Sequence, residues 1–249
     1  MGNRLAIIDW GIGGVSIYAS VKERLGDIPV TYFSDTGVTP YGKMTRSELI
    51  SRLNAVIKYL KSNSVTHLVI GCNAASTAIH YLDNQGLKIE SVIDSAVEKV
   101  VKQKPKRLGL IGGRRTVLSG VYRKAFAAHG IRVEQRIAQP LSGLIESGDT
   151  SSGILRDAAT HILSPLRNCS HILLACTHYP AISAILNDLV SPNTTLIDPA
   201  PELVRKIAQW PLSKGGEDIF LTSGDTRQMK ISAQNAFGVK IDKALTVRF

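Results

Sequence analysis

Short apolar runs alternate with longer amphipathic stretches along most of this chain. The first apolar runs are "RLAIID" at 4–9, "VTYFS" at 30–34 and "HLVIG" at 67–71, and the stretches that follow them cover 15–25, 47–62 and 75–84. The apolar runs have the length and the Val, Ile and aromatic content of buried strands, whereas the stretches between them have the apolar spacing of helices. This alternation predicts an α/β fold built on parallel sheets.

The pattern restarts after about 100 residues. "RLAIID" begins at Arg4 and "RLGLIG" at Arg107, which lie 103 positions apart. The cysteines that end "HLVIGC" and "HILLAC" are 104 positions apart, and so are the aspartates of "SVIDSA" and "TLIDPA". Strand-like Val/Ile/Leu runs can also recur without a repeat, but three matches in one order favour a duplicated unit.

The repeat predicts two similar α/β units. Residues 1–95 together with 209–249 form the first unit, and residues 96–208 form the second. The stretch "DIFLTSGDTRQMKISAQNAFG" is typical of one strand and one helix that ends at Gly238, and we expect it to rejoin the first unit. Related units pack about a pseudo-twofold axis, so equivalent residues should face each other across a cleft.

Composition and charge narrow the class of protein. The chain has 249 residues, of which 44% are hydrophobic, which is enough for a packed core. No stretch approaches the roughly 20 apolar residues of a membrane span, so we expect a cytoplasmic protein without a membrane partner. The formal net charge is +10, with basic residues grouped at Lys99, Lys102, Lys104, Lys106, Arg107, Arg114 and Arg115. Aromatic residues make up only 6% and no nucleic-acid-binding motif is present, so a solvated basic face is the preferred interpretation.

Two of the three cysteines lie where a parallel sheet binds its ligands. Cys72 and Cys176 each follow a predicted strand and precede a predicted helix, and the carboxyl ends of such strands line the ligand crevice. Backbone N–H groups at a helix start favour the thiolate form. Buried structural cysteines are the alternative. The polar flanks "CNAAS" and "CTHYP" favour a functional site, whereas the spacing of Cys169 and Cys176 does not fit a zinc site.

A pair of facing thiols suits the inversion of a stereocentre. A base removes a proton from one face while an acid delivers a proton to the other face, and the two roles exchange in the reverse direction. At any moment one group must be a thiolate and the other a thiol, so their titrations are coupled.

Seven motifs spread over the chain make the resemblance to a known family plain. They are "DWGIGG" at 9–14, "YFSDTGVTPYG" at 32–42, "VIGCNAAS" at 69–76, "GGRRTVLSGVY" at 112–122, "PLSGLIESG" at 140–148, "ACTHYP" at 175–180 and "FLTSGD" at 220–225. The chain resembles the cofactor-independent glutamate racemases of the aspartate/glutamate racemase superfamily. The resemblance implies two pseudo-twofold-related, flavodoxin-like parallel-sheet domains with the active site in the cleft between them.

The resemblance also implies roles for individual residues. Cys72 and Cys176 are the expected catalytic acid/bases, assisted by Asp9, Glu146 and His178. The expected contacts to an acidic amino-acid substrate are Asp9, Trp10, Tyr41, Gly42, Asn73, Ala74, Thr116, Thr177 and His178. A capping role for Asp9 and an ordinary surface position for Glu146 are the alternatives. We expect no metal and no cofactor, because no lysine has a Schiff-base context and no cluster has ligand spacing, and we expect a homodimer.

Two positions depart from the glutamate racemases that the chain resembles. Trp10 stands where they have a serine, and Ala74 stands where they have a threonine. A large ring in place of a hydroxyl predicts a smaller pocket and a slight preference for aspartate over glutamate. If the ring of Trp10 instead turns away into the domain interface, the pocket is unchanged. The alternative function is that of a glutamate racemase that supplies D-glutamate to peptidoglycan.

Two readings from other classes remain open at this point. "GIGGVS" follows a strand and Asp35 ends the next one, as in a dinucleotide-binding protein, although the full G-x-G-x-x-G spacing is absent. The second alternative is a homologue that lacks racemase activity and binds nucleic acid through its positive charge.

Overall fold

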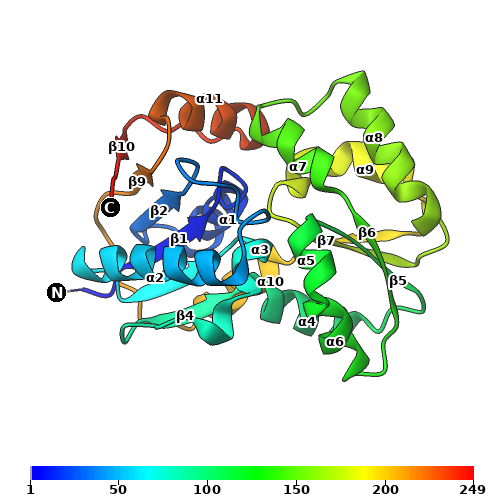
Figure 1. Ribbon diagram of the computed structural model, residues 1–249, viewed down its shortest axis with the longest axis horizontal. Coiled ribbons are helices and arrows are strands. Elements are labelled where there is room, and N and C mark those ends of the chain that lie inside the picture. The colour runs from blue at the N-terminus through cyan, green and yellow to red at the C-terminus, as the bar shows by residue number, and fades with distance from the viewer. Residues whose placement is uncertain (1) are drawn as a thin grey trace.

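Two parallel sheets form the centre of the molecule in the computed structural model, which describes residues 2–249 (Figure 1). The first sheet has six strands in the order β10-β9-β2-β1-β3-β4, and the second has four in the order β6-β5-β7-β8. The strands are β1 (Leu5–Asp9), β2 (Val30–Ser34), β3 (His67–Ile70), β4 (Lys88–Ser91), β5 (Leu108–Gly112), β6 (Val133–Ile137), β7 (His171–Ala175), β8 (Thr195–Ile197), β9 (Ile219–Thr222) and β10 (Ala244–Thr246). Every pairing is parallel, as the alternating pattern predicts.

The order of strands repeats between the sheets. The series β2-β1-β3-β4 in the first sheet corresponds to β6-β5-β7-β8 in the second. The register corresponds as well, since Leu5 pairs with His67 in the first sheet and Leu108 pairs with His171 in the second. Matching order and register explain the sequence offsets of 103 and 104 better than chance recurrence of apolar runs does.

The strand and helix expected after residue 217 are present as β9 and α11 (Thr226–Phe237). Helix α11 ends before Gly238, which has a φ of 66°, and β9 pairs with β2 of the first sheet. Strand β10, which pairs with β9, was not expected. It spans three residues that are half-buried or exposed, so it carries no apolar pattern.

The helices lie between and around the two sheets. They are α1 (Val15–Leu25), α2 (Arg46–Ser62), α3 (Asn73–Ser76), α4 (Val92–Gln103), α5 (Arg114–Ser119), α6 (Val121–Ala127), α7 (Gln139–Glu146), α8 (Gly153–Leu163), α9 (Ser183–Leu189), α10 (Ala200–Ile207) and α11 (Thr226–Phe237), with short 3₁₀ turns η1 (Ile79–Tyr81), η2 (Ser164–Leu166) and η3 (Tyr179–Ile182). Thr45 and Glu48 form a reciprocal capping box that fixes the start of α2.

The helix expected over 75–84 is wrong. The structure has only the four-residue α3, followed by η1. The hydroxyl of Ser76 donates to the carbonyl oxygens of Cys72 and Ile70, and the hydroxyl of Thr77 donates to that of Ala74. Such side-chain bonds to nearby carbonyls compete with a continuing helix. They hold the segment after Cys72 in a compact turn.

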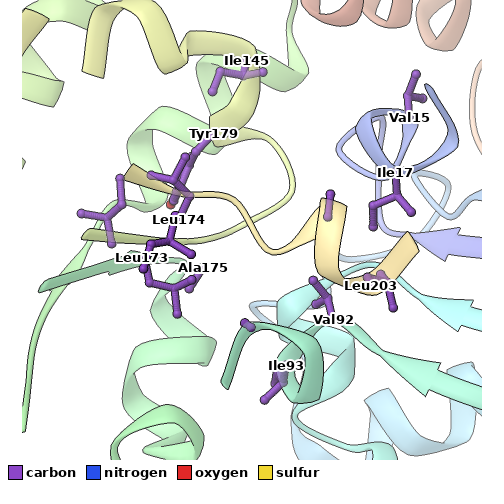
Figure 2. Close-up of a cluster of buried hydrophobic side chains, with 14 of the residues drawn as sticks. Val15, Ile17, Val92, Ile93, Ile145, Leu173, Leu174, Ala175, Tyr179 and Leu203 are labelled. Carbon is purple, nitrogen blue, oxygen red and sulfur yellow. The ribbon is translucent and has the colours of Figure 1, made fainter. Parts of the chain in front are cut away.

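One hydrophobic cluster joins the two sheets. It includes Leu5 of β1 and Leu108 of β5. Figure 2 shows Leu203 of α10 near Val92 of α4 and Ile17 of α1, and α10 packs against both of these helices. We propose that residues 1–95 with 209–249 and residues 96–208 are the two structural units, and that α4 and α10 connect them.

The surface bears on two further expectations. No helix within residues 2–249 is both long and apolar enough to cross a membrane. Part of the basic cluster is paired with acids, because Lys102 contacts Glu202 at 2.5 Å and Arg107 contacts Glu134 at 2.7 Å. Pairing of this kind is typical of a solvated face and weakens the argument for a nucleic-acid partner.

Candidate active site

A cavity of about 290 Å³ lies between the sheets, at the carboxyl ends of β1, β3 and β7. Both Cys72 and Cys176 line it, and so does every residue expected to contact a substrate. Its lining comprises Asp9, Trp10, Pro40, Tyr41, Gly42, Lys43, Cys72, Asn73, Ala74, Gly113, Thr116, Gln139, Ser142, Gly143, Ala175, Cys176, Thr177 and His178. Glu146 is the one predicted site residue outside this lining.

Sequence reasoning missed several of the lining residues. They are Pro40, Lys43, Gly113, Gln139, Ser142, Gly143 and Ala175. All seven lie within or next to the quoted motifs, so the motifs located the segments without identifying the individual contacts. Lys43 adds an exposed cation at the cavity, which suits an anionic ligand.

Cys72 is a buried thiol. It precedes α3 and is 9% exposed. Burial raises the pKa of the Cys72 thiol well above its ordinary value, and the negative charge of Asp9 raises it further. The backbone N–H of Ala75 acts in the opposite direction but does not compensate. The expectation that the helix start favours a thiolate is therefore wrong at Cys72, because α3 is too short to outweigh desolvation.

Asp9 joins the two halves of the site. Its Oδ1 accepts the backbone N–H of Trp10 at 2.7 Å, and its Oδ2 accepts the hydroxyl of Thr177 at 2.6 Å. The carboxyl group is 1% exposed, and burial raises its pKa. Asp9 thus does cap its own turn, but it also contacts the loop that carries the second thiol.

Cys176 lies in a different environment. It is half-buried, and its Sγ is 3.6 Å from Nδ1 of His178. Nε2 of His178 is 2.6 Å from Oε2 of Glu146, which also accepts the backbone N–H of Ile12 at 2.9 Å. Burial of the ring opposes its protonation, but the hydrogen bonds to Cys176 and Glu146 prevail and raise the pKa of His178 well above its ordinary value. Cys176 therefore lies beside a basic ring that Glu146 holds in place.

Two glycines allow the 11–14 turn to approach these groups. A Cβ at Gly11 would lie 2.0 Å from Oε2 of Glu146, and a Cβ at Gly13 would lie 2.4 Å from Oγ1 of Thr177. The glycine-rich segment therefore serves close packing between the two halves of the site. This accounts for "GIGG" without a bound dinucleotide.

Asp35 has a structural role. Its carboxylate is fully buried and accepts two bonds from Arg52, at 2.8 and 2.6 Å, and one from the Tyr41 hydroxyl at 2.6 Å. This arrangement fixes Tyr41 in the cavity wall. Because its oxygens are occupied, Asp35 is not free to bind a ribose, and the dinucleotide interpretation loses its acidic residue.

Asn73 carries an available donor. The Tyr122 hydroxyl donates to its Oδ1 at 2.7 Å, which fixes the orientation of the amide. The Nδ2 group is buried and has no hydrogen-bond partner within residues 2–249. Asn73 lines the cavity, so a bound ligand can supply that partner. A buried unpaired donor is costly unless a ligand satisfies it. A substrate carboxylate fits this position.

Comparison with known proteins agrees with this site. The sequence profile of the Asp/Glu/Hydantoin racemase family matches residues 5–207. A glutamate racemase of Synechococcus sp. (strain CC9605) is 32% identical over 209 residues, which cover 82% of this chain and 78% of the relative.

Solved structures show the same fold. The glutamate racemase of Francisella tularensis subsp. tularensis SCHU S4, solved in complex with D-glutamate, superposes with a TM-score of 0.90 at 22% identity, covering 100% of this chain and 98% of that chain. The aspartate racemase of Picrophilus torridus gives a TM-score of 0.67 at 18% identity, covering 86% of this chain and 96% of that chain. The chain therefore belongs to the Asp/Glu/Hydantoin racemase family.

Proposed function

We propose that this amino-acid racemase interconverts L- and D-glutamate by a two-thiol mechanism. The observation that carries the proposal is the placement of Cys72 and Cys176 on one cavity, each at the end of the equivalent strand of its sheet. Each thiol also has its own titratable neighbour, Asp9 for Cys72 and His178 for Cys176.

The reaction conserves protons within the site. One thiolate takes the Cα proton of the substrate and becomes a thiol, and the electron pair of the C–H bond stays on Cα. The opposite thiol then delivers its proton to the other face of Cα and becomes a thiolate. The reverse direction uses the same two groups with their roles exchanged.

The cavity offers partners for a dicarboxylate. Nδ2 of Asn73 is an unpaired donor next to Cys72, and Lys43 supplies positive charge near Tyr41 and Gly42. We propose that these groups bind the two carboxylates. Thr116, Thr177 and the remaining predicted contacts line the same space and complete the substrate site.

Glutamate is a better-supported substrate than aspartate. The Synechococcus relative is named a glutamate racemase, and the Francisella structure superposes better than the aspartate racemase of Picrophilus. The slight aspartate preference expected from Trp10 has less support, although the indole does line the cavity. Trp10 narrows the pocket in this proposal without selecting the shorter acid.

The test is chiral chromatography of each acid after incubation with the purified protein, without added cofactor. We expect both L- and D-glutamate to racemise, with kcat/KM higher than for aspartate, and activity to survive dialysis against EDTA. The Cys72→Ala/Cys176→Ala double variant is the control for contaminating racemases. If neither enantiomer of glutamate were converted into the other, the assignment would be overturned. A higher kcat/KM for aspartate than for glutamate would also overturn it.

A further inference from the structure

A second cavity, of about 480 Å³, lies directly beyond Trp10. Ser34 and Thr36 line it from the end of β2, and Glu146 and Ser147 line it from the end of α7. Gly224, Asp225, Gln228 and Met229, at or just before the start of α11, complete it. The residues that line both this cavity and the substrate cavity are Trp10 and Gly143.

Trp10 contributes the side chain that lines both cavities. Its backbone N–H is held by Asp9, and its indole Nε1 donates to the carbonyl oxygen of Val38 at 3.2 Å. One hydrogen bond therefore holds the backbone of Trp10 and another holds its indole ring. Gly143 has no side chain, and a Cβ added there would meet nothing within 4 Å. Removing the indole would thus join the two spaces.

The second cavity has its own chemistry. Glu146 and Asp225 line it, and no lysine or arginine does. Ser34 contributes a fully buried hydroxyl without a hydrogen-bond partner within the described chain, and Met229 contributes an apolar surface. Such a lining suits a neutral substituent and repels an additional carboxylate.

We propose that Trp10 sets the upper size limit of the substrate, as a partition that keeps side-chain substituents out of the second cavity. The inference rests on the proposed binding of glutamate in the first cavity. An acidic amino acid with a neutral branch on its side chain is excluded by the indole. Without the indole, that branch enters the second cavity while both carboxylates keep their partners.

The experiment compares glutamate with 4-propylglutamate in the wild type and in Trp10→Ser. The readouts are the dissociation constant from calorimetry and kcat/KM from chiral chromatography. We expect the wild type to prefer glutamate and the variant to shift the ratio of affinities toward 4-propylglutamate by roughly 50-fold, the scale of burying three carbon atoms. An unchanged ratio overturns the partition.

Gln228→Trp provides the matched control. Gln228 is exposed and lines the second cavity without lining the first. A tryptophan there should leave glutamate turnover of the wild type unchanged, and should cancel the gain for 4-propylglutamate in the Trp10→Ser background. A gain that persists in the double variant would show that the branch does not enter the second cavity and would overturn the proposal.

The two proposals fail in different ways. A shifted affinity ratio without any racemisation of glutamate supports the partition and contradicts the proposed function. Racemisation of glutamate with an unshifted ratio contradicts the partition and leaves the proposed function standing.

Discussion

The two thiols occupy equivalent places in the two sheets but have different neighbours. Cys72 is buried next to the carboxyl group of Asp9. Its burial and the charge of Asp9 both raise the pKa of the Cys72 thiol. Cys176 is half-buried next to His178, whose ring is linked to Glu146. The backbone repeats, whereas the charges around the thiols do not.

In the proposed two-thiol mechanism, this difference separates the protonation behaviour of the two thiols. The raised pKa of His178 favours an imidazolium beside Cys176, and the raised pKa of Cys72 favours its thiol form. The two thiols thus differ in the group that can exchange a proton with each of them. Because L and D enantiomers have equal free energy, kcat/KM must be the same in both directions. The asymmetry is measurable only in half-reactions that use one thiol.

The largest expected effect comes from removing either thiol. Cys72→Ser and Cys176→Ser should each lower racemisation by at least about 10⁴-fold, because an alkoxide is far less accessible than a thiolate near neutral pH. Each variant should still eliminate chloride from one enantiomer of a β-chloro substrate analogue, since elimination needs only one base. Racemisation by either variant at a near wild-type rate would disprove the two-thiol mechanism.

Replacing His178 should slow only one half-reaction. In His178→Asn, deprotonation by Cys176 loses its imidazolium, and we expect elimination to fall by about 10²- to 10³-fold. The affected enantiomer is the one that Cys72→Ser still turns over. The other enantiomer should react at close to the wild-type rate, and equal losses for both would contradict the assignment of His178 to Cys176.

Replacing Asp9 should slow the opposite half-reaction, by about 10²-fold. Asp9→Asn keeps an oxygen for the backbone N–H of Trp10 but removes the carboxylate that would accept the proton of the buried Cys72 thiol. We expect this loss of a proton acceptor to outweigh the lower Cys72 pKa that removal of the negative charge brings. The enantiomer that Cys176→Ser still turns over should be the one affected. A loss confined to the other enantiomer would reverse the pairing of Asp9 with Cys72.

The same variant should be more stable than the wild type at neutral pH. Burial raises the pKa of Asp9 in the folded state, so the fold favours the protonated acid. That contribution is fully present below about pH 4 and is lost as pH rises through the folded-state pKa. In urea titrations, Asp9→Asn should therefore gain roughly 0.5–2 kcal/mol in free energy of unfolding at pH 7. The gain should shrink toward pH 4, and a gain independent of pH would contradict this cause.

The smallest effect is expected at Glu146. Glu146→Gln keeps an oxygen for the backbone N–H of Ile12 and for His178, so it removes charge and preserves contact. We expect a loss of about 3- to 10-fold, confined to the enantiomer that depends on His178. Glu146→Ala should lower activity further because it removes the contacts as well as the charge. A similar loss in both variants would show that the charge alone carries the effect and would contradict a role for the contacts.

Local patterns and motifs predicted two parallel-sheet units and the chain segments that line the cavity. The strand that ends at Asp9, the helix at 15–25 and the positions of Cys72 and Cys176 all follow from apolar periodicity and strand ends. The matching offsets also predicted two similar units, and the second sheet does repeat the order of four strands of the first.

Contacts between distant residues could not be predicted in this way. Thr177 donates to Asp9 across 168 positions, and Glu146 reaches His178 across 32. No local pattern encodes these distances. The end of α3 was missed because hydroxyl bonds to nearby carbonyls overrode a sequence with good helix propensity. The second cavity depends on the packing of α7, α11 and Trp10 together.

The position of β9 has a consequence for how the molecule forms during synthesis. Thr31 of β2 pairs with Ile219 of β9. The first sheet therefore cannot be completed until residue 219 has been synthesised and has left the ribosome. The second sheet draws its strands only from residues 108–197. Because distant pairings close slowly, we expect the second sheet to be formed first and to serve as the surface on which the first is completed.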